Sequence, residues 1–187
     1  MTGDAVRVLR AEDHARMAWS NGGGTTYEVA TSPAGASLGS FDWRVSLADV
    51  AAGGPFSAFP GIDRILVLLE GPGMELVVDG RVVPLDRLDP VRFDGAADTS
   101  CTLLGGPTRD LNVMTRRGRC TATVEVVRVD GEADIPGGTG TTALAVVVDG
   151  GVSVDGVALG PRDVLVVDRA MAPRGAASLV VIRISTA

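Results

Sequence analysis

The chain has no lysine and a single histidine, and both scarcities exclude whole classes of function. All 17 basic residues are arginines, yet the formal net charge is −6. Such an acidic chain lacks the broad basic face that a phosphate backbone requires, so we expect no nucleic-acid partner. With His14 alone, the chain cannot build the imidazole-rich ligand sets of metal-binding barrels, so we expect no metal and no other cofactor.

The sequence also lacks a long apolar run, an export signal and a cysteine framework. Its apolar runs are short: Ile65 to Leu69 stops at Glu70, well short of the ~20 residues that a membrane helix needs. Charged residues interrupt the N-terminal segment before a secretory core can form. We therefore expect a cytoplasmic protein with no membrane partner. Cys101 and Cys120 are predicted to be buried thiols, with a bridge between them as the less favoured alternative.

Turn-forming and apolar residues, by contrast, are abundant. Glycine occurs 25 times, proline 10 times, and hydrophobic residues make up 45% of the chain. This composition is enough to bury a core, and many tight turns favour short strands over long helices. A period of two marks strands such as the one at 41–47, whereas helix-periodic runs with caps are nearly absent. The sequence therefore predicts an all-β fold.

An internal repeat indicates two β-units. The first copy contains an apolar strand at 65–69, a glycine turn, a second strand and an Asp-Gly hairpin, and the same order recurs from 144 to 167. Such a repeat is typical of two similar barrels packed together. We expect one barrel over 1–128 and a second unit over 129–187 that exchanges strands with N-terminal residues. The polar, glycine-rich stretch 130–142 would form part of the junction.

The most informative segment is 19–26, in which three glycines, Gly22 to Gly24, follow Trp19 and Asn21. A phosphate loop would need a lysine, and a dinucleotide fingerprint would need a following helix, and neither is present. Consecutive glycines instead suggest a backbone bent into shapes that a Cβ would forbid, or pressed close to something else.

Three segments combine arginine, amide or hydroxyl groups, glycine and large apolar residues: 19–28, 41–46 with 55–64, and 105–118. This mixture suits a small apolar-walled pocket with a few polar contacts. Since the arginine fork matches a carboxylate through two parallel hydrogen bonds, we expect a binder of a small organic acid. Simpler interpretations stay open for single residues. Arg44 alternates with aromatic residues and could be a solvated charge, and Arg64 could pair with Asp63.

Two further function classes remain as alternatives. Because His14 is poorly placed, a metal-independent enzyme would have to use Glu28, Asp63, Asp110, Tyr27 or a cysteine, each with a shifted pKa, and we take Glu28 as the candidate base. No Gly-x-Ser-x-Gly elbow occurs, so acyl transfer is not favoured. An interaction module that binds a regulator protein is the third hypothesis, although no exposed amphipathic stripe supports it.

The motifs of these segments resemble those of the HutD/Ves family. Trp-Ser-Asn-Gly-Gly-Gly-Thr-Thr-Tyr-Glu-Val-Ala at 19–30 is similar to the family's opening signature, and the blocks at 41–46, 54–64 and 106–114 follow in the expected order. The resemblance covers about Val6 to Glu125, and beyond Asp130 it rests on pattern rather than motif.

The resemblance implies an all-β bicupin, two cupin barrels of the jelly-roll type, that binds no metal. It also implies a regulatory role in histidine utilisation through the sensing of a small acidic intermediate, with N-formyl-glutamate as the leading candidate, whereas the Ves branch has no settled activity. A homodimer is left open. The ligand-binding residues carried onto this chain lie in the first barrel and are Trp19, Asn21, Thr25, Glu28, Arg44, Ser46, Phe56, Phe59, Arg64 and Asn112.

Overall fold

The computed structural model describes residues 5–138 and 140–187, and the chain divides into two compact units. The larger unit consists of residues 15–121 with Ala187, and the smaller unit consists of the residues up to His14 with residues 122–186. The boundary expected at 128/129 falls inside strand β12 (Cys120–Glu132), which begins in the larger unit and continues in the smaller one.

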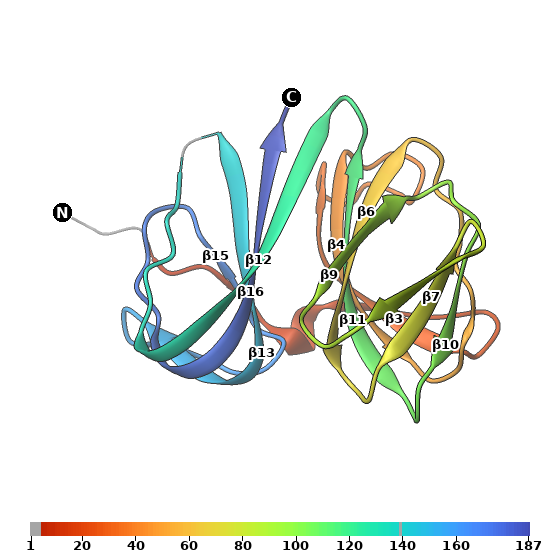
Figure 1. Ribbon diagram of the computed structural model, residues 1–187. Coiled ribbons are helices and arrows are strands. Elements are labelled where there is room, and N and C mark those ends of the chain that lie inside the picture. The colour runs from red at the N-terminus through yellow and green to blue at the C-terminus, as the bar shows by residue number, and fades with distance from the viewer. Residues whose placement is uncertain (1–4, 139) are drawn as a thin grey trace. The chain divides into compact units, whose positions relative to one another are not determined.

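The larger unit contains two antiparallel sheets (Figure 1). The six-stranded sheet has the order β2 (Ala15–Ala18), β3 (Gly24–Ser32), β4 (Trp43–Val50), β11 (Thr108–Arg116), β6 (Ile62–Glu70) and β9 (Pro90–Asp94). The four-stranded sheet has the order β5 (Gly54–Pro55), β10 (Thr99–Leu103), β7 (Met74–Val78) and β8 (Arg81–Leu85). Strand β11 therefore lies in the middle of the larger sheet, between β4 and β6, which both come much earlier in the chain.

The smaller unit is built on one antiparallel sheet. Its order is β1 (Val8–Leu9), β15 (Val164–Val166), β13 (Thr141–Val154), β16 (Arg174–Thr186) and β12, and β14 (Val157–Leu159) pairs with β13. A short 3-10 helix, η1 (Ala11–Asp13), follows β1. The N-terminal strand thus completes a sheet whose other strands come from the end of the chain, since Val8 pairs with Leu165.

The all-β prediction is confirmed, and the strands predicted around 65–69, 75–78 and 144–148 fall within β6, β7 and β13. Two details differ. The two prolines and three glycines of the stretch 53–61 predict a loop, but the stretch contains the two-residue strand β5, because Gly54 and Pro55 pair with β10. The stretch 130–142 is less loop-like than expected, because β12 and β13 extend into it. In the described residues, no helix has the length and hydropathy to cross a membrane.

Each unit has its own buried core. In the larger unit, Leu66, Leu68, Met74, Leu76 and Leu85 form an apolar cluster. In the smaller unit the cluster is almost wholly aliphatic and includes Ile135, Val147, Leu179 and Val181. Burial of such side chains stabilises each unit by about 25 cal/mol per Å² of apolar surface removed from water.

The two cysteines are buried thiols, as predicted, and neither is in a disulfide. Cys101 lies on β10 and Cys120 at the start of β12. Burial raises the pKa of both thiols, which keeps them protonated and unreactive at neutral pH.

Candidate functional site

A cavity of about 390 Å³ opens inside the larger unit. Its walls come from β2 and the turn after it, from β3, β4, β6 and β11, and from the segment 55–59. The lining residues are Met17, Ala18, Trp19, Ser20, Asn21, Thr26, Leu38, Arg44, Ser46, Ala48, Pro55, Phe56, Ser57, Phe59, Arg64, Asp110, Asn112 and Met114. A volume of this size is within the range of small-molecule sites.

Strand alternation places the polar lining residues in rows across the large sheet. Successive side chains of a strand point to opposite faces, so the even-numbered residues of β4, β6 and β11 share one face. Three rows follow from the register: Arg44–Met114–Arg64, Ser46–Asn112–Leu66 and Ala48–Asp110–Leu68. Successive rows are about 7 Å apart, since a strand rises 3.2–3.4 Å per residue. The cavity wall thus presents arginines in one row, a hydroxyl and an amide in the next, and a carboxyl in the third.

Arg44 is a buried cation with two hydrogen-bond partners. Its residue is 5% exposed, its Nε donates to Glu28 Oε2 at 2.7 Å, and its Nη1 donates to Ser46 Oγ at 3.2 Å. The remaining nitrogen, Nη2, is buried and donates no hydrogen bond within the described part of the chain. The alternative that Arg44 is a solvated surface charge is therefore wrong.

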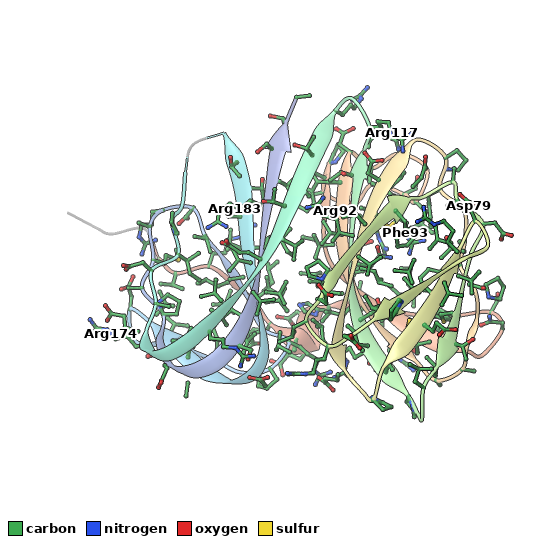
Figure 2. All side chains as sticks on the ribbon, in the orientation of Figure 1. Asp79, Arg92, Phe93, Arg117, Arg174 and Arg183 are labelled. Carbon is green, nitrogen blue, oxygen red and sulfur yellow. The ribbon has the colours of Figure 1, made fainter. Side chains whose placement is uncertain are left out.

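Arg64 is held by aromatic rings rather than by a carboxylate. Its guanidinium carbon lies 5.1 Å from the ring centre of Phe56, 5.7 Å from that of Phe59 and 5.0 Å from that of Phe93. Phe93 lies on β9 and is labelled in Figure 2. Cation–π contacts of this kind stabilise a desolvated guanidinium. Local pairing with Asp63 does not occur, because Asp63 instead binds Arg117.

The hydrogen bonds of Arg64 leave it partly unsatisfied. Nη1 donates to the Ser57 carbonyl at 3.4 Å, and Nε is buried without an acceptor among the described residues. Burial lowers the pKa of Arg64 to about 10, an effect that Asp110 opposes and Arg44 reinforces. The side chain therefore remains a cation at neutral pH, in an environment that would favour an added negative charge.

Asp110 is the functional candidate that the sequence-based site residues omit. It lines the cavity, is 3% exposed, and among the described residues no donor forms a hydrogen bond or ion pair with its carboxyl. Burial raises the pKa of Asp110 to about 7, although the positive charge of Arg64 lowers it, and the charge of Asp49 raises it further. A register shift separates Asp110 from Arg109, whose side chain binds Asp49 and Glu70 instead.

The glycine segment closes one end of this wall. The amide of Gly23 donates to Asn21 Oδ1 at 2.9 Å, and Trp19 Nε1 donates to Thr26 Oγ1 at 2.8 Å. A Cβ on Gly24 would lie 2.5 Å from the Asp49 carbonyl oxygen and 2.9 Å from a Trp19 ring carbon. The prediction that a glycine here allows a close backbone approach is confirmed, and the approach fixes Trp19 beside the cavity.

The structure brings most of the expected site residues together. All of them line the cavity except Thr25 and Glu28. Thr25 is adjacent to Thr26, which lines the cavity, so alternation along β3 directs Thr25 away from it. Glu28 acts through Arg44, to which it is bonded. Asn112 Oδ1 is buried with no donor bound to it within 5–138 and 140–187.

Nothing in the described residues resembles a metal centre. No group of three or more His, Cys, Asp and Glu side chains there is arranged to hold a metal ion. His14 belongs to the smaller unit and is 9% exposed, and its burial lowers its pKa. The polar groups of the cavity suit an anionic organic ligand better than a cation, because its two arginines repel positive charge.

Comparison with known proteins matches the chain to one family. The family model described as HutD matches residues 11–180. Over 110 residues the chain is 46% identical to an uncharacterised 21.2 kDa protein in the hutC 3′ region of Pseudomonas putida and 42% identical to Protein Ves of Citrobacter koseri. These alignments cover 58% of this chain and only 57% and 56% of the respective relatives, so the chain spans little more than half of their length.

Solved structures extend the similarity to the whole chain. HutD from Pseudomonas fluorescens SBW25 is 35% identical, with a TM-score of 0.84 over 98% of this chain and 100% of that one. A cupin 2 conserved barrel domain protein from Leptotrichia buccalis, 12% identical, matches 88% of this chain and 89% of its own with a TM-score of 0.57. The second likeness concerns the fold alone, and together the two confirm the cupin-like, all-β prediction.

Proposed function

Because this chain belongs to the HutD family, we propose that its larger unit binds a small carboxylate metabolite and serves a role related to histidine utilisation. The observation that carries the proposal is the convergence of two buried guanidinium groups on one cavity. Arg44 and Arg64 are each 5% exposed and flank Met114 in a single row of the sheet. N-formyl-glutamate is the candidate that the family relationship favours.

Unsatisfied donors support an anionic ligand. Arg44 Nη2 and Arg64 Nε are buried without acceptors among the described residues. A buried donor without a partner costs about 1–3 kcal/mol, and more for a charged group. A carboxylate between the two arginines would supply both acceptors and negative charge, and the phenylalanines around Arg64 would strengthen the attraction by excluding water.

The remaining polar groups suit the rest of such a ligand. Ser46 and Asn112 form the row next to the arginines, so they can bind a hydroxyl, carbonyl or amide group one row further along. Asn112 Oδ1 is an acceptor without a donor among the described residues, which favours a ligand with an N–H group. An acyl-amino acid has both the carboxylate and the N–H group.

Isothermal titration of the full chain with N-formyl-glutamate, glutamate and formate tests the proposal. We expect measurable binding of at least one acid, weakened about 30-fold or more in Arg64→Met, because loss of a buried charge contact costs about 2–5 kcal/mol. Arg81→Met, which removes an exposed arginine of the same unit, is the matched control and should bind normally. Folded protein that gives no heat with any acid, or an Arg64→Met variant that binds like the wild type, would refute the proposal.

A second candidate is a metal-independent enzyme that acts on the same class of acid, and it is favoured by one observation. Asp110 lies in the cavity, and its pKa of about 7 suits a general base at neutral pH. Glu28 is less suitable for that role because Arg44 holds it. Incubation with N-formyl-glutamate, followed by NMR, would show product that Asp110→Asn no longer forms. An NMR spectrum of the acid that stays unchanged at high protein concentration would contradict the enzyme function and favour binding alone.

A further inference from the structure

The buried charges of the cavity are balanced before any ligand enters. Arg44 is bonded to Glu28, and the positive charge of Arg64 acts on Asp110, which lowers the pKa of that carboxyl and opposes its burial. An entering carboxylate adds a negative charge to this nearly neutral set. An uncompensated charge among buried side chains is costly, and a proton taken up with the anion would restore the balance.

Asp110 is the side chain best placed to take up this proton. The residue is 3% exposed and lines the cavity, and its carboxyl accepts no hydrogen bond from a described residue, so no fixed donor competes with the ligand for it. It lies two rows from the arginines and one row from Asn112, which places it opposite the anchored end of an extended ligand. Glu28, by contrast, is committed to Arg44.

We propose that the acid binds together with one proton, which Asp110 takes up and then donates as an O–H hydrogen bond to an oxygen at the distal end of the ligand. The inference rests on the proposed binding function and deepens it. The preferred ligand carries a carboxylate for the arginine row and a second oxygen-bearing group, carboxylate or carbonyl, for Asp110. No bond of the ligand is broken, and the proton comes from solvent.

The surrounding charged groups are consistent with this assignment. Arg64 on β6 and Arg44 on β4 lie on the ligand side, and Asp49 on β4 and Cys101 on β10 are the other titratable groups that interact with Asp110. Asp49 is paired with Arg109 at 2.6 Å, and burial raises the pKa of Cys101, so that thiol stays neutral. Asp110 is therefore the acid in this set that changes charge near neutral pH.

The sign of the pH dependence follows from linkage. The free protein has an Asp110 pKa of about 7, and bound anion raises it further. The complex then holds more protons than the free protein above pH 7, so affinity falls as pH rises, by about tenfold per pH unit while the complex stays protonated. Below pH 6 the affinity is constant. The carboxyls of the ligand titrate near 4 and do not contribute in this range.

The test is isothermal titration of the full chain with N-formyl-glutamate at pH 6, 7, 8 and 9, in buffers of different ionisation enthalpy. We expect uptake of about one proton at pH 8 and a loss of affinity of about 50-fold between pH 7 and 9. Asp110→Asn mimics the protonated acid, so its affinity should be constant across this range and exceed that of the wild type at pH 9. Asp86→Asn, an exposed carboxyl of the same unit, is the matched control and should keep the wild-type profile.

The outcomes separate the two proposals. Absence of binding at every pH overturns the binding function and this inference with it. Binding of equal strength from pH 6 to 9, without proton uptake, overturns the inference alone. A pH profile that persists in Asp110→Asn also overturns it, because another group would then carry the proton.

Discussion

The two units share an antiparallel architecture but differ in what they bury. The larger unit encloses the ionisable side chains of Arg44, Arg64 and Asp110 beside a cavity. In the smaller unit the buried polar residues, as far as the structure describes them, are His14 and Ser178, and aliphatic side chains fill the core. The comparison teaches that the same strand pattern can fill a unit with aliphatic side chains or leave a cavity lined by charged groups. The side chains on one sheet face decide between the two outcomes.

The difference has an energetic consequence. A guanidinium taken out of water loses hydration that ion pairs and cation–π contacts only partly replace, and unsatisfied donors add to the cost. The aliphatic core of the smaller unit has no such cost and contributes stability directly. We therefore expect the buried charged groups to make the larger unit less stable than an aliphatic core would. Four substitutions, in order of decreasing effect, test this contrast.

The largest effect is expected from truncation of the smaller unit's core. Leu179 is 1% exposed within the aliphatic cluster, so Leu179→Ala should lower the free energy of unfolding by about 3 kcal/mol through lost burial and a residual cavity. Chemical denaturation measures the loss. Affinity for the acid, measured on the folded variant, should stay unchanged, and a parallel loss of affinity would contradict the division of roles.

Replacing buried charges of the larger unit with uncharged side chains should keep stability and remove binding, which is the opposite of the Leu179→Ala result. Arg44→Met combined with Glu28→Gln removes a buried ion pair, and such replacements are often neutral or stabilising by about 1–4 kcal/mol. The double variant should therefore melt no lower than the wild type while binding of the acid is lost. Arg169→Met, which removes an exposed pair with Asp155 in the smaller unit, should change neither property. A large drop in stability of the double variant would show that the ion pair is structural.

The close approach at Gly24 gives an intermediate effect. A Cβ there would meet the Asp49 carbonyl at 2.5 Å, so Gly24→Ala should destabilise the protein by about 1–3 kcal/mol and shift Trp19. Thermal unfolding and the fluorescence of the tryptophans report on both. Gly54→Ala is the control, because a Cβ at Gly54 meets nothing within 4 Å. Equal melting temperatures for the two variants would contradict a steric requirement at Gly24.

The smallest effect concerns the histidine of the smaller unit. Burial lowers the pKa of His14 below its usual 6.5, so the unfolded chain binds the proton more readily than the folded one. Stability from this group is therefore fully present above pH 6.5 and is lost as pH falls through the lower folded pKa. His14→Gln should flatten the pH dependence of the melting temperature between pH 7 and 5 by an amount worth less than about 1 kcal/mol. An unchanged slope would assign that dependence to other groups.

Much of the fold was predictable because its signals are local. Alternating apolar residues and Asp-Gly turns predict strands from short stretches, and β6, β7 and β13 lie where these patterns are strongest. The central strand β11 was not assigned as a strand from sequence, because its polar residues at 109, 110 and 112 hide the alternation. Two of these polar residues, Asp110 and Asn112, line the cavity.

Most of the site was predictable for a different reason. Trp19, Arg44, Arg64 and Asn112 stand out by residue type within glycine-rich and aromatic segments, and the cavity gathers all four. From sequence, Asp110 is only one of several possible catalytic bases, because a structural salt bridge explains the adjacent Arg109 and Asp110 as well as a site does. Thr25 is predicted as a site residue, but Thr26 lines the cavity instead. Adjacent residues of a strand point to opposite faces, so an error of one residue selects the wrong face.

The sequence by itself determined the all-β character, the turn positions and the family, because these depend on residue types and spacings along short segments. Only the tertiary structure decided that Arg44 lies inside, that Arg64 is surrounded by three phenylalanines, and that Asp110 lies in the cavity wall. Alternation states which residues share a face of a strand. It does not state which face is buried or which strands become neighbours, and the pairing of β11 with β4 and β6 settled both.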